Sequence, residues 1–251
     1  MSHAGRFVWR ELITPNPEAA AAFYGQVFGW SARVMPMGDG HYTMLSHGEV
    51  GVGGVMKPMM DGVPPHWLDY ITVDDVDASL ARVPALGGKA ITGAMDIPNV
   101  GRFAVVADPG GAVFALFRGA NPGETDTESR PADYTFCWSQ LLASDPAKSA
   151  AFYTEIFGWQ TAPLGADGVM FLRNGRPVAG SQLRPAGAGG ADHWLPYVAV
   201  PDADRYHAKA VEAGARSYHA PLTIPNMGRF AVLGDPTGAT VALWRDLSAA
   251  E

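Results

Sequence analysis

The stretch PNVGRFAVVADPGGA, residues 98–112, returns as PNMGRFAVLGDPTGA at residues 225–239. Working outward, FYGQVFGW at 23–30 matches FYTEIFGW at 152–159, and HWLDYITV at 66–73 matches HWLPYVAV at 193–200. Matches in the same order over most of a chain predict two copies of one structural unit.

Each copy contains the signals of a β-α-β-β-β module used twice. Residues 7–14 predict a strand, Asn16 a helix cap, and residues 17–29 a helix whose apolar stripe ends at Gly29. Two or three short strands follow, and 66–73 predicts another strand leading into a second helix that Pro84 shortens. The DP stretches at 108–111 and 235–238 are typical of tight turns between strands.

Composition narrows the range of functions. The chain has 251 residues, 47% of them hydrophobic, and a net charge of −7, which disfavours a nucleic-acid or anionic-membrane partner. The single cysteine, Cys137, excludes an intramolecular disulfide and a multi-cysteine metal site, and we expect it to fill apolar space on a strand. No apolar run approaches the roughly 20 residues that cross a bilayer, so we expect a cytoplasmic protein.

The stretch between the copies, residues 119–133, is polar and contains prolines, which is typical of an exposed linker. We therefore predict domains at 1–118 and 134–251. Four modules can complete two sites within one chain, so both a monomer and a homodimer stay open.

The chain resembles the glyoxalase/bleomycin-resistance/dioxygenase superfamily, also called the vicinal-oxygen-chelate fold. The resemblance lies in the four modules and in the motifs FY-x-x-x-FGW, V-D-D-V-D-A and D-P-x-G. The resemblance implies an α+β fold in which paired βαβββ modules form two tandem domains with curved, mostly antiparallel sheets. It also implies that each domain holds a small molecule in a cup.

Metal-dependent members of that family place His, Glu or Gln at a strand position seven residues before a helix cap and near the end of the last strand. Carried onto this chain, those positions are Trp9, Leu68, Ala115, Trp138, Leu195 and Ala242. None of these side chains coordinates a divalent metal, so we expect no metal or other cofactor. A displaced site that uses other ligands stays open as the alternative.

Side chains alternate between the two faces of a sheet along each strand, so every second residue of a strand is predicted to face the cup. Trp9 and Trp138 could form the floor of their cups, on which a flat ligand would stack, although packing in the core explains these residues nearly as well. The histidines at the strand starts, His66 and His193, more often serve as structural hydrogen-bonding groups than as catalysts. The further candidates for ligand binding are Tyr70, Phe103, Gln140, Tyr197 and Phe230, and Glu11 is the candidate acid–base residue.

Three hypotheses follow. The first is a metal-free small-molecule-binding protein, similar in logic to bleomycin-resistance proteins. The second is a glyoxalase-like lyase or isomerase, or a dioxygenase, that uses displaced metal ligands or acid–base work by Glu11. In the third, one domain binds and the other is structural; because Glu11 becomes Gln140 in the second copy, the N-terminal cup would be the functional one. The sequence contains no G-x-S-x-G, Walker loop or H-E-x-x-H motif.

Overall fold

The computed structural model describes residues 4–38, 40–121, 132–185 and 190–248. The strands form two mixed sheets, one from each half of the chain, with the orders β2-β3-β4-β1-β5-β9-β8-β6 and β11-β12-β13-β10-β14-β17-β16-β15. In the first sheet β7 pairs with β8 beside this path. The predicted α+β fold is confirmed. Residues 122–131 of the predicted linker lie outside the described residues, so the proposed domain boundaries stay a prediction.

The first half contains two βαβββ modules. The first module consists of β1 (Phe7–Ile13), α1 (Pro17–Phe28), β2 (Ser31–Met37), β3 (Gly40–His47) and β4 (Val50–Met56). The second consists of β5 (His66–Thr72), α2 (Val76–Arg82), the 3-10 turn η1 (Pro84–Leu86), β6 (Lys89–Ala90), β7 (Met95–Ile97), β8 (Gly101–Ala107) and β9 (Val113–Gly119). Antiparallel hairpins build most of this sheet, while β1 runs parallel to β4 and β5 parallel to β9.

The second half repeats this pattern. Its third module consists of β10 (Phe136–Ala143), α3 (Pro146–Phe157), β11 (Gln160–Leu164), β12 (Gly168–Arg173) and β13 (Arg176–Leu183). The fourth consists of β14 (His193–Ala199), α4 (Ala203–Glu212), β15 (Arg216–Ile224), β16 (Gly228–Gly234) and β17 (Thr240–Asp246). The single strand β15 stands where the second module has β6 and β7. The four-module prediction is confirmed.

The helix signals in the sequence act as predicted. The Asn16 side chain accepts a hydrogen bond from the backbone of Ala19, and α1 ends at Gly29, whose φ of 75° is the left-handed conformation that glycine adopts without strain. Pro84 removes a backbone donor, so α2 stops at Arg82 and the chain continues as a 3-10 turn.

The second DP turn, at residues 235–238, connects to the first half of the chain through a network of hydrogen bonds. Asp235 accepts hydrogen bonds through Oδ1 from the backbone N–H groups of residues 237–239. Its Oδ2 accepts a 3.0 Å bond from the Tyr24 hydroxyl, and that hydroxyl accepts a 3.0 Å bond from the Trp67 indole. Tyr24 belongs to the first FY-x-x-x-FGW motif, so this motif and the second DP turn stabilise each other.

The second copy of the network has the same form. Asp108 accepts hydrogen bonds from the backbone of residues 110 and 112 and a 3.2 Å bond from the Tyr153 hydroxyl. Trp194 donates to that hydroxyl at 3.0 Å. The signature stretch is therefore a structural node that holds a helix tyrosine against a turn.

Packing divides the chain into two compact units that combine modules from different halves. Unit 1 comprises Met1–Trp9, Leu68–Glu128 and Ser139–Trp194, and unit 2 comprises Arg10–Trp67, Ser129–Trp138 and Leu195–Glu251. Each sheet therefore follows one half of the sequence, whereas each hydrophobic core joins the first module to the fourth or the second to the third.

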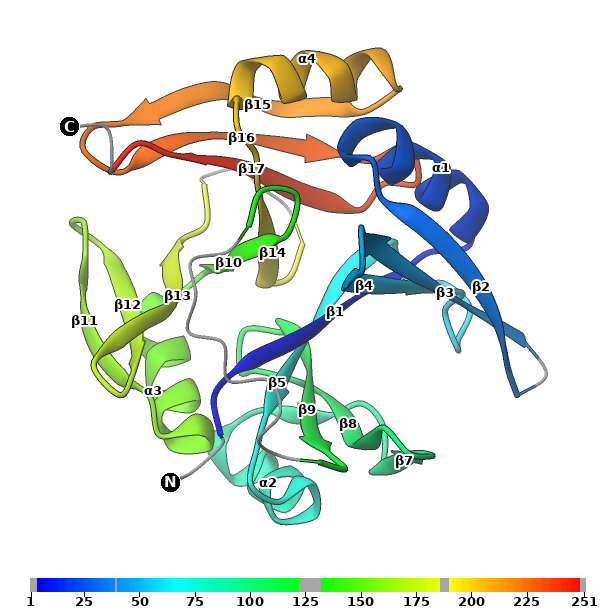
Figure 1. Ribbon diagram of the computed structural model, residues 1–251. Coiled ribbons are helices and arrows are strands. Elements are labelled where there is room, and N and C mark those ends of the chain that lie inside the picture. Colours follow the sequence, from blue (N-terminus) through cyan, green and yellow to red (C-terminus); the bar gives the residue numbers. More distant parts are fainter. Residues whose placement is uncertain (1–3, 39, 122–131, 186–189, 249–251) are drawn as a thin grey trace. The chain divides into compact units, whose positions relative to one another are not determined.

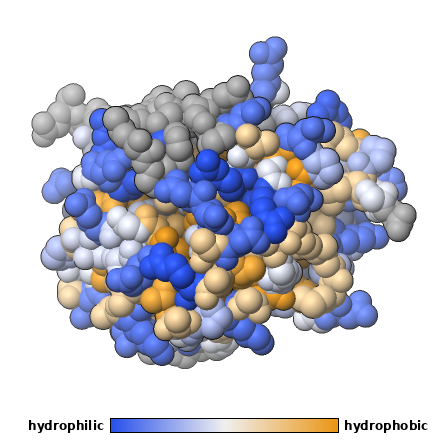
Figure 2. All heavy atoms as spheres, turned by 90° about the horizontal axis from the view of Figure 1, so that it is seen from below, coloured by the Kyte–Doolittle hydropathy of each residue, from blue (hydrophilic) through white to orange (hydrophobic). Residues whose placement is uncertain are grey.

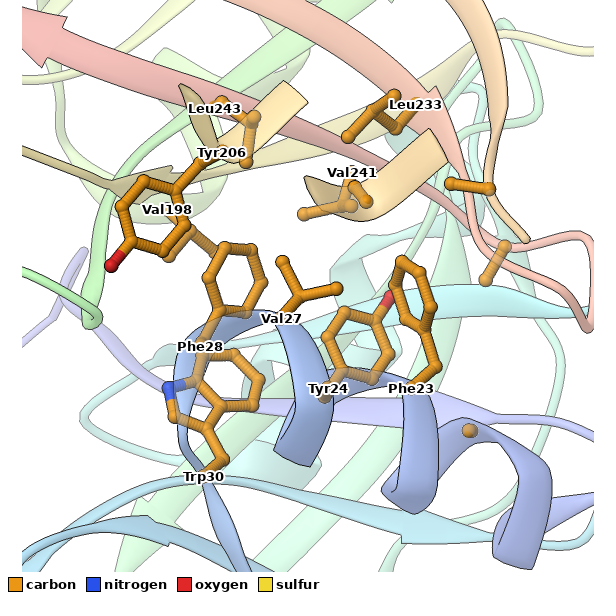
Figure 3. Close-up of a cluster of buried hydrophobic side chains, with 14 of the residues drawn as sticks. Phe23, Tyr24, Val27, Phe28, Trp30, Val198, Tyr206, Leu233, Val241 and Leu243 are labelled. Atoms are coloured by element: carbon orange, nitrogen blue, oxygen red, sulfur yellow. The ribbon is translucent and has the colours of Figure 1, made fainter. Parts of the chain in front are cut away.

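In unit 2, α4 lies along β15, β16 and β17, with α1 beside it (Figure 1). The predicted apolar stripe of α1, which includes Phe23, Tyr24 and Phe28, is buried. Figure 3 shows these side chains and Trp30 facing Tyr206 of α4 and the apolar residues of the fourth module. The aromatic residues of the FGW motifs are core, as predicted.

The described part of the chain contains no helix long and apolar enough to span a membrane. Figure 2 shows hydrophobic residues between hydrophilic ones over one face of the molecule. Scattered exposed apolar side chains are normal on protein surfaces, so they carry no functional argument by themselves.

Candidate functional site

In unit 1 an aromatic cluster forms on three adjacent strands. Tyr70 of β5 lies 5.8 Å from Phe103 of β8 and 5.9 Å from Phe117 of β9, measured between ring centroids. Phe103 and Phe117 are direct partners across the hairpin, and the ring of Phe117 lies so close to Gly101 that an added Cβ would come within 2.9 Å of it. Phe103 and Phe117 are half-buried, whereas Tyr70 is buried.

Unit 2 repeats the cluster with two changes. Tyr197 of β14 lies 6.4 Å from Trp244 of β17, and Trp244 is the direct strand partner of Phe230. His219 of β15, where the first copy has Thr92, stacks on Phe230 at 5.2 Å with the ring planes 24° apart. Trp244 replaces Phe117 and covers Gly228 in the same way.

Each cluster contains two of the predicted ligand-binding residues. These are Tyr70 and Phe103 in the first cluster and Tyr197 and Phe230 in the second. Sequence reasoning missed Phe117, Trp244 and His219. The first two could have been found, because a tight DP turn fixes the register of its hairpin and hence which residue stands opposite each phenylalanine.

Next to the second cluster, Cys137 of β10 donates a hydrogen bond of 3.4 Å from Sγ to the backbone oxygen of Tyr197. Burial raises the pKa of the Cys137 thiol to about 12 and the pKa of the Tyr197 phenol to about 12. Both groups are therefore neutral at physiological pH. Cys137 lies on a strand as predicted and is half-buried.

Because its raised pKa keeps Cys137 protonated, we expect its alkylation by iodoacetamide at pH 8 to be at least ~100-fold slower than that of free cysteine. Mass spectrometry of timed samples measures the rate. In urea the same residue should react at the rate of free cysteine. A native rate equal to that of glutathione would contradict the burial of the thiol.

Glu11 and Gln140 occupy equivalent, buried positions on β1 and β10, with 6% and 5% of their surfaces exposed. Glu11 stands opposite Gly54 of β4, and Gln140 stands opposite Gly180 of β13. The Gln140 amide lies over Gly180, where an added Cβ would come within 2.6 Å of its Oε1. Over Gly54 lies the hydroxyl of Tyr42 instead, a residue that sequence reasoning missed because nothing in the sequence pairs it with Gly54.

The two candidate histidines begin β5 and β14. His66 contacts the carbonyl oxygen of Pro64 through Nδ1 at 2.8 Å, and His193 contacts that of Ala191 at 3.2 Å. A carbonyl only accepts, so Nδ1 carries the proton in both. Burial lowers the pKa of His66, which keeps its ring neutral. These bonds fit the structural role weighed for both residues.

The tryptophans Trp9 and Trp138 lie on β1 and β10, and both are half-buried. Partial exposure is compatible with ligand contact, and neither residue belongs to the buried core. Their role as a ligand floor stays a prediction.

The residues at the family's metal positions do not fit a divalent ion. Leu68, Leu195, Ala115 and Ala242 are buried and offer no donor atom, and the alanines lie beside Tyr70 and Tyr197 in the strand register. Within the described ranges, no three His, Cys, Asp or Glu side chains gather closely enough to hold a metal.

The repeated Asn-x-Gly-Arg segment forms the turn that its sequence predicts. Asn99 and Asn226 adopt the left-handed conformation with φ of 62° and 61°. Arg102 binds Asp77 with two hydrogen bonds of 2.8 Å, and Arg229 binds Asp204 at 2.6 and 2.7 Å. Each arginine therefore ties its hairpin to the preceding helix.

Comparisons with known proteins agree with this architecture. The model of the Glyoxalase/Bleomycin resistance protein/Dioxygenase superfamily matches residues 3–116, and that of the Glyoxalase-like domain matches residues 136–244. CFP32 of Mycobacterium tuberculosis, provisionally named a glyoxylase, is 36% identical over 92% of this chain and 91% of its own length. The anthracycline biosynthesis protein DnrV of Streptomyces peucetius is 33% identical over 94% and 91%.

Solved structures of low identity share the fold. The Mn(II)-bound glyoxalase of Novosphingobium aromaticivorans has a TM-score of 0.63 at 15% identity and covers 98% of this chain and 84% of its own. The 2,3-dioxygenase LapB of Pseudomonas sp. KL28 has a TM-score of 0.64 at 14% identity, with coverage of 97% and 93%. The chain belongs to the glyoxalase/bleomycin resistance protein/dioxygenase superfamily and carries two of its domains in tandem.

Proposed function

We propose that the protein binds a planar, largely apolar small molecule, without a metal ion, against the aromatic clusters of its two hairpins. The observation that carries this proposal is the repetition of the same trio at the same register: Tyr70, Phe103 and Phe117 in one copy, and Tyr197, Phe230 and Trp244 in the other. Aromatic rings with accessible faces stack well on flat ligands.

The metal-free part of the proposal is supported by the donor chemistry of the six family positions, which hold tryptophan, leucine and alanine. The ligand class is supported by relatives named for anthracycline biosynthesis, since an anthracycline contains a planar fused-ring system.

The alternative is an enzyme of the superfamily, in which Glu11 acts as acid–base or displaced ligands hold a metal. Burial of a carboxylate is the observation that favours it, because buried acids often have functional roles. Metal analysis of protein purified without chelator tests the metal-dependent form of this alternative, and an activity assay of Glu11→Gln tests the acid–base form. A stoichiometric transition metal would overturn the metal-free proposal.

We expect Phe117→Leu and Trp244→Leu each to weaken binding of 2-(hydroxymethyl)anthraquinone by about 5- to 10-fold at its own site, since stacking contributes about 1–1.5 kcal/mol. Isothermal titration calorimetry measures this without relying on tryptophan emission. Tyr218→Ser is the control, because Tyr218 is exposed and lies next to Arg216 rather than in the cluster. Unchanged affinity in both cluster variants would contradict the proposal.

A further inference from the structure

One face of the first module's strands combines a buried carboxylate with flexible apolar side chains. The register places Glu11 opposite Gly54, Gly54 opposite Met44, and Tyr42 opposite Met35, and it also places the exposed Arg33 opposite Met44. Because side chains alternate, these residues share the face opposite the one whose core residues are Leu12, Leu45 and Val55.

Met56 extends this face, since it lies two residues beyond Gly54 on β4. Met35, Tyr42, Met44 and Met56 are all half-buried. We call the set Glu11, Met35, Tyr42, Met44, Gly54 and Met56 the methionine face.

The chemistry of the methionine face suits an aromatic cation. Thioether side chains are flexible and polarizable, so they adapt to irregular apolar ligands and contact aromatic rings favourably. Glu11 is 94% shielded from solvent, where a charge–charge contact is screened less than at the surface. A carboxylate accepts several hydrogen bonds, so it can receive an ammonium group besides its protein contacts.

Gly54 makes room for this arrangement. A Cβ at this position would collide with the Tyr42 hydroxyl, so only glycine lets the phenol lie over the strand beside Glu11. The hydroxyl offers a further hydrogen-bonding group next to the carboxylate.

The equivalent face of the third module lacks these features. Its register places Gln140 opposite Gly180, Gly180 opposite Met170, and Leu164 opposite Gly168. Gln140 therefore replaces Glu11, Gly168 replaces Tyr42 and Leu164 replaces Met35, while Gln182 stands in place of Met56. This face has no charge at the Glu11 position and one methionine in place of three.

We propose that the methionine face is a binding site for a planar aromatic compound that carries a protonated amine, and that Glu11 is its charge-selecting residue. The inference rests on the proposed function for the planar class of the ligand, and it goes beyond that function by adding a site in the first module that selects the charge of the ligand.

Three probes that differ in one substituent test it: 2-(aminomethyl)anthraquinone, a cation at pH 7, the neutral 2-(hydroxymethyl)anthraquinone, and the anion anthraquinone-2-carboxylate. Titration calorimetry of the full chain should give about 10-fold tighter binding of the cation than of the neutral probe, as one charge-assisted contact contributes about 1.5 kcal/mol. The anion should bind more weakly than the neutral probe.

Glu11→Gln keeps the shape and removes the charge, so it should abolish the preference for the cation and leave the affinity of the neutral probe within twofold. Glu18→Gln, which removes a carboxylate of the same kind from the exposed first turn of α1, is the matched control and should keep the preference. Met44→Ala should weaken both the cation and the neutral probe, and circular dichroism checks that each variant folds.

The outcomes separate the two proposals. If none of the probes binds, the proposed function fails. If the neutral probe binds but the wild-type protein does not prefer the cation, or if Glu11→Gln retains the preference, only the inference about Glu11 is overturned. Should Glu11→Gln not fold, the order of the three probes on the wild-type protein still decides.

Discussion

Replacing Asp235 with alanine is expected to lower the free energy of unfolding by about 3–5 kcal/mol, because it strips the acceptor from several buried donors at once. Asp235 is 4% exposed and accepts hydrogen bonds from three backbone N–H groups and from the Tyr24 hydroxyl. Tyr24 in turn accepts from Trp67, so the loss extends into the core of unit 2.

Urea unfolding followed by circular dichroism measures this loss. The control is Asp204→Ala, which breaks the bidentate pair with Arg229; Asp204 is 61% exposed, and surface pairs contribute less than about 1 kcal/mol. A double-mutant cycle with Tyr24→Phe isolates the Asp235–Tyr24 bond, for which we expect a coupling of about 1–2 kcal/mol. Equal losses for Asp235→Ala and Asp204→Ala would show that the turn aspartate is not a structural node.

The sequence predicted most of what this network is built from. Several features depend only on residues that are close together in the sequence, so the sequence alone predicts them. They are the apolar stripe through Phe23, Tyr24 and Phe28, the caps at Asn16 and Gly29, and the DP turns. The order of the modules followed from the internal repeat, and the resemblance added the fold that these modules build together. These parts are confirmed by the structure and by the family comparisons.

Other parts depend on contacts between distant residues, which a repeat cannot assign. Tyr24 could pack with the DP turn of either the second or the fourth module, because both turns have the same sequence pattern; the structure places it at Asp235, in the fourth. The position of the Tyr42 hydroxyl over Gly54 likewise depends on the twist and bulge of neighbouring strands. The alternation of side chains along β1 predicts that Glu11 lies on the methionine face. It does not predict that the Tyr42 hydroxyl lies beside Glu11.

The second large effect is expected at high pH, where Tyr24 and Tyr153 add to the alkali sensitivity that follows from the raised pKa values of Tyr197 and Cys137. The pKa of Tyr24 is raised well above its usual range, first by burial and then by the charge of Asp235. The pKa of Tyr153 is raised in the same way, first by burial and then by Asp108. The folded chain therefore keeps both protons at pH values where the unfolded chain releases them.

The sign follows from proton counting. Below a pH of about 10 both states hold these protons, and the stability from the two hydroxyls is fully present. Above it the unfolded state binds fewer protons, so each tyrosine lowers the free energy of unfolding by about 1.4 kcal/mol per pH unit until the folded-state pKa is reached. At pH 11.5 the two tyrosines together should remove about 4 kcal/mol.

Tyr24→Phe and Tyr153→Phe separate this ionisation from the hydrogen bonds that it accompanies. At pH 7 each variant should be less stable than the wild type by about 1–2 kcal/mol, since a phenylalanine donates nothing to Asp235 or Asp108. Between pH 10 and 11.5 each should lose stability less steeply, so that its curve approaches that of the wild type. Urea titrations at half-unit pH intervals measure both, and parallel curves for wild type and variants would place the alkaline transition on other groups.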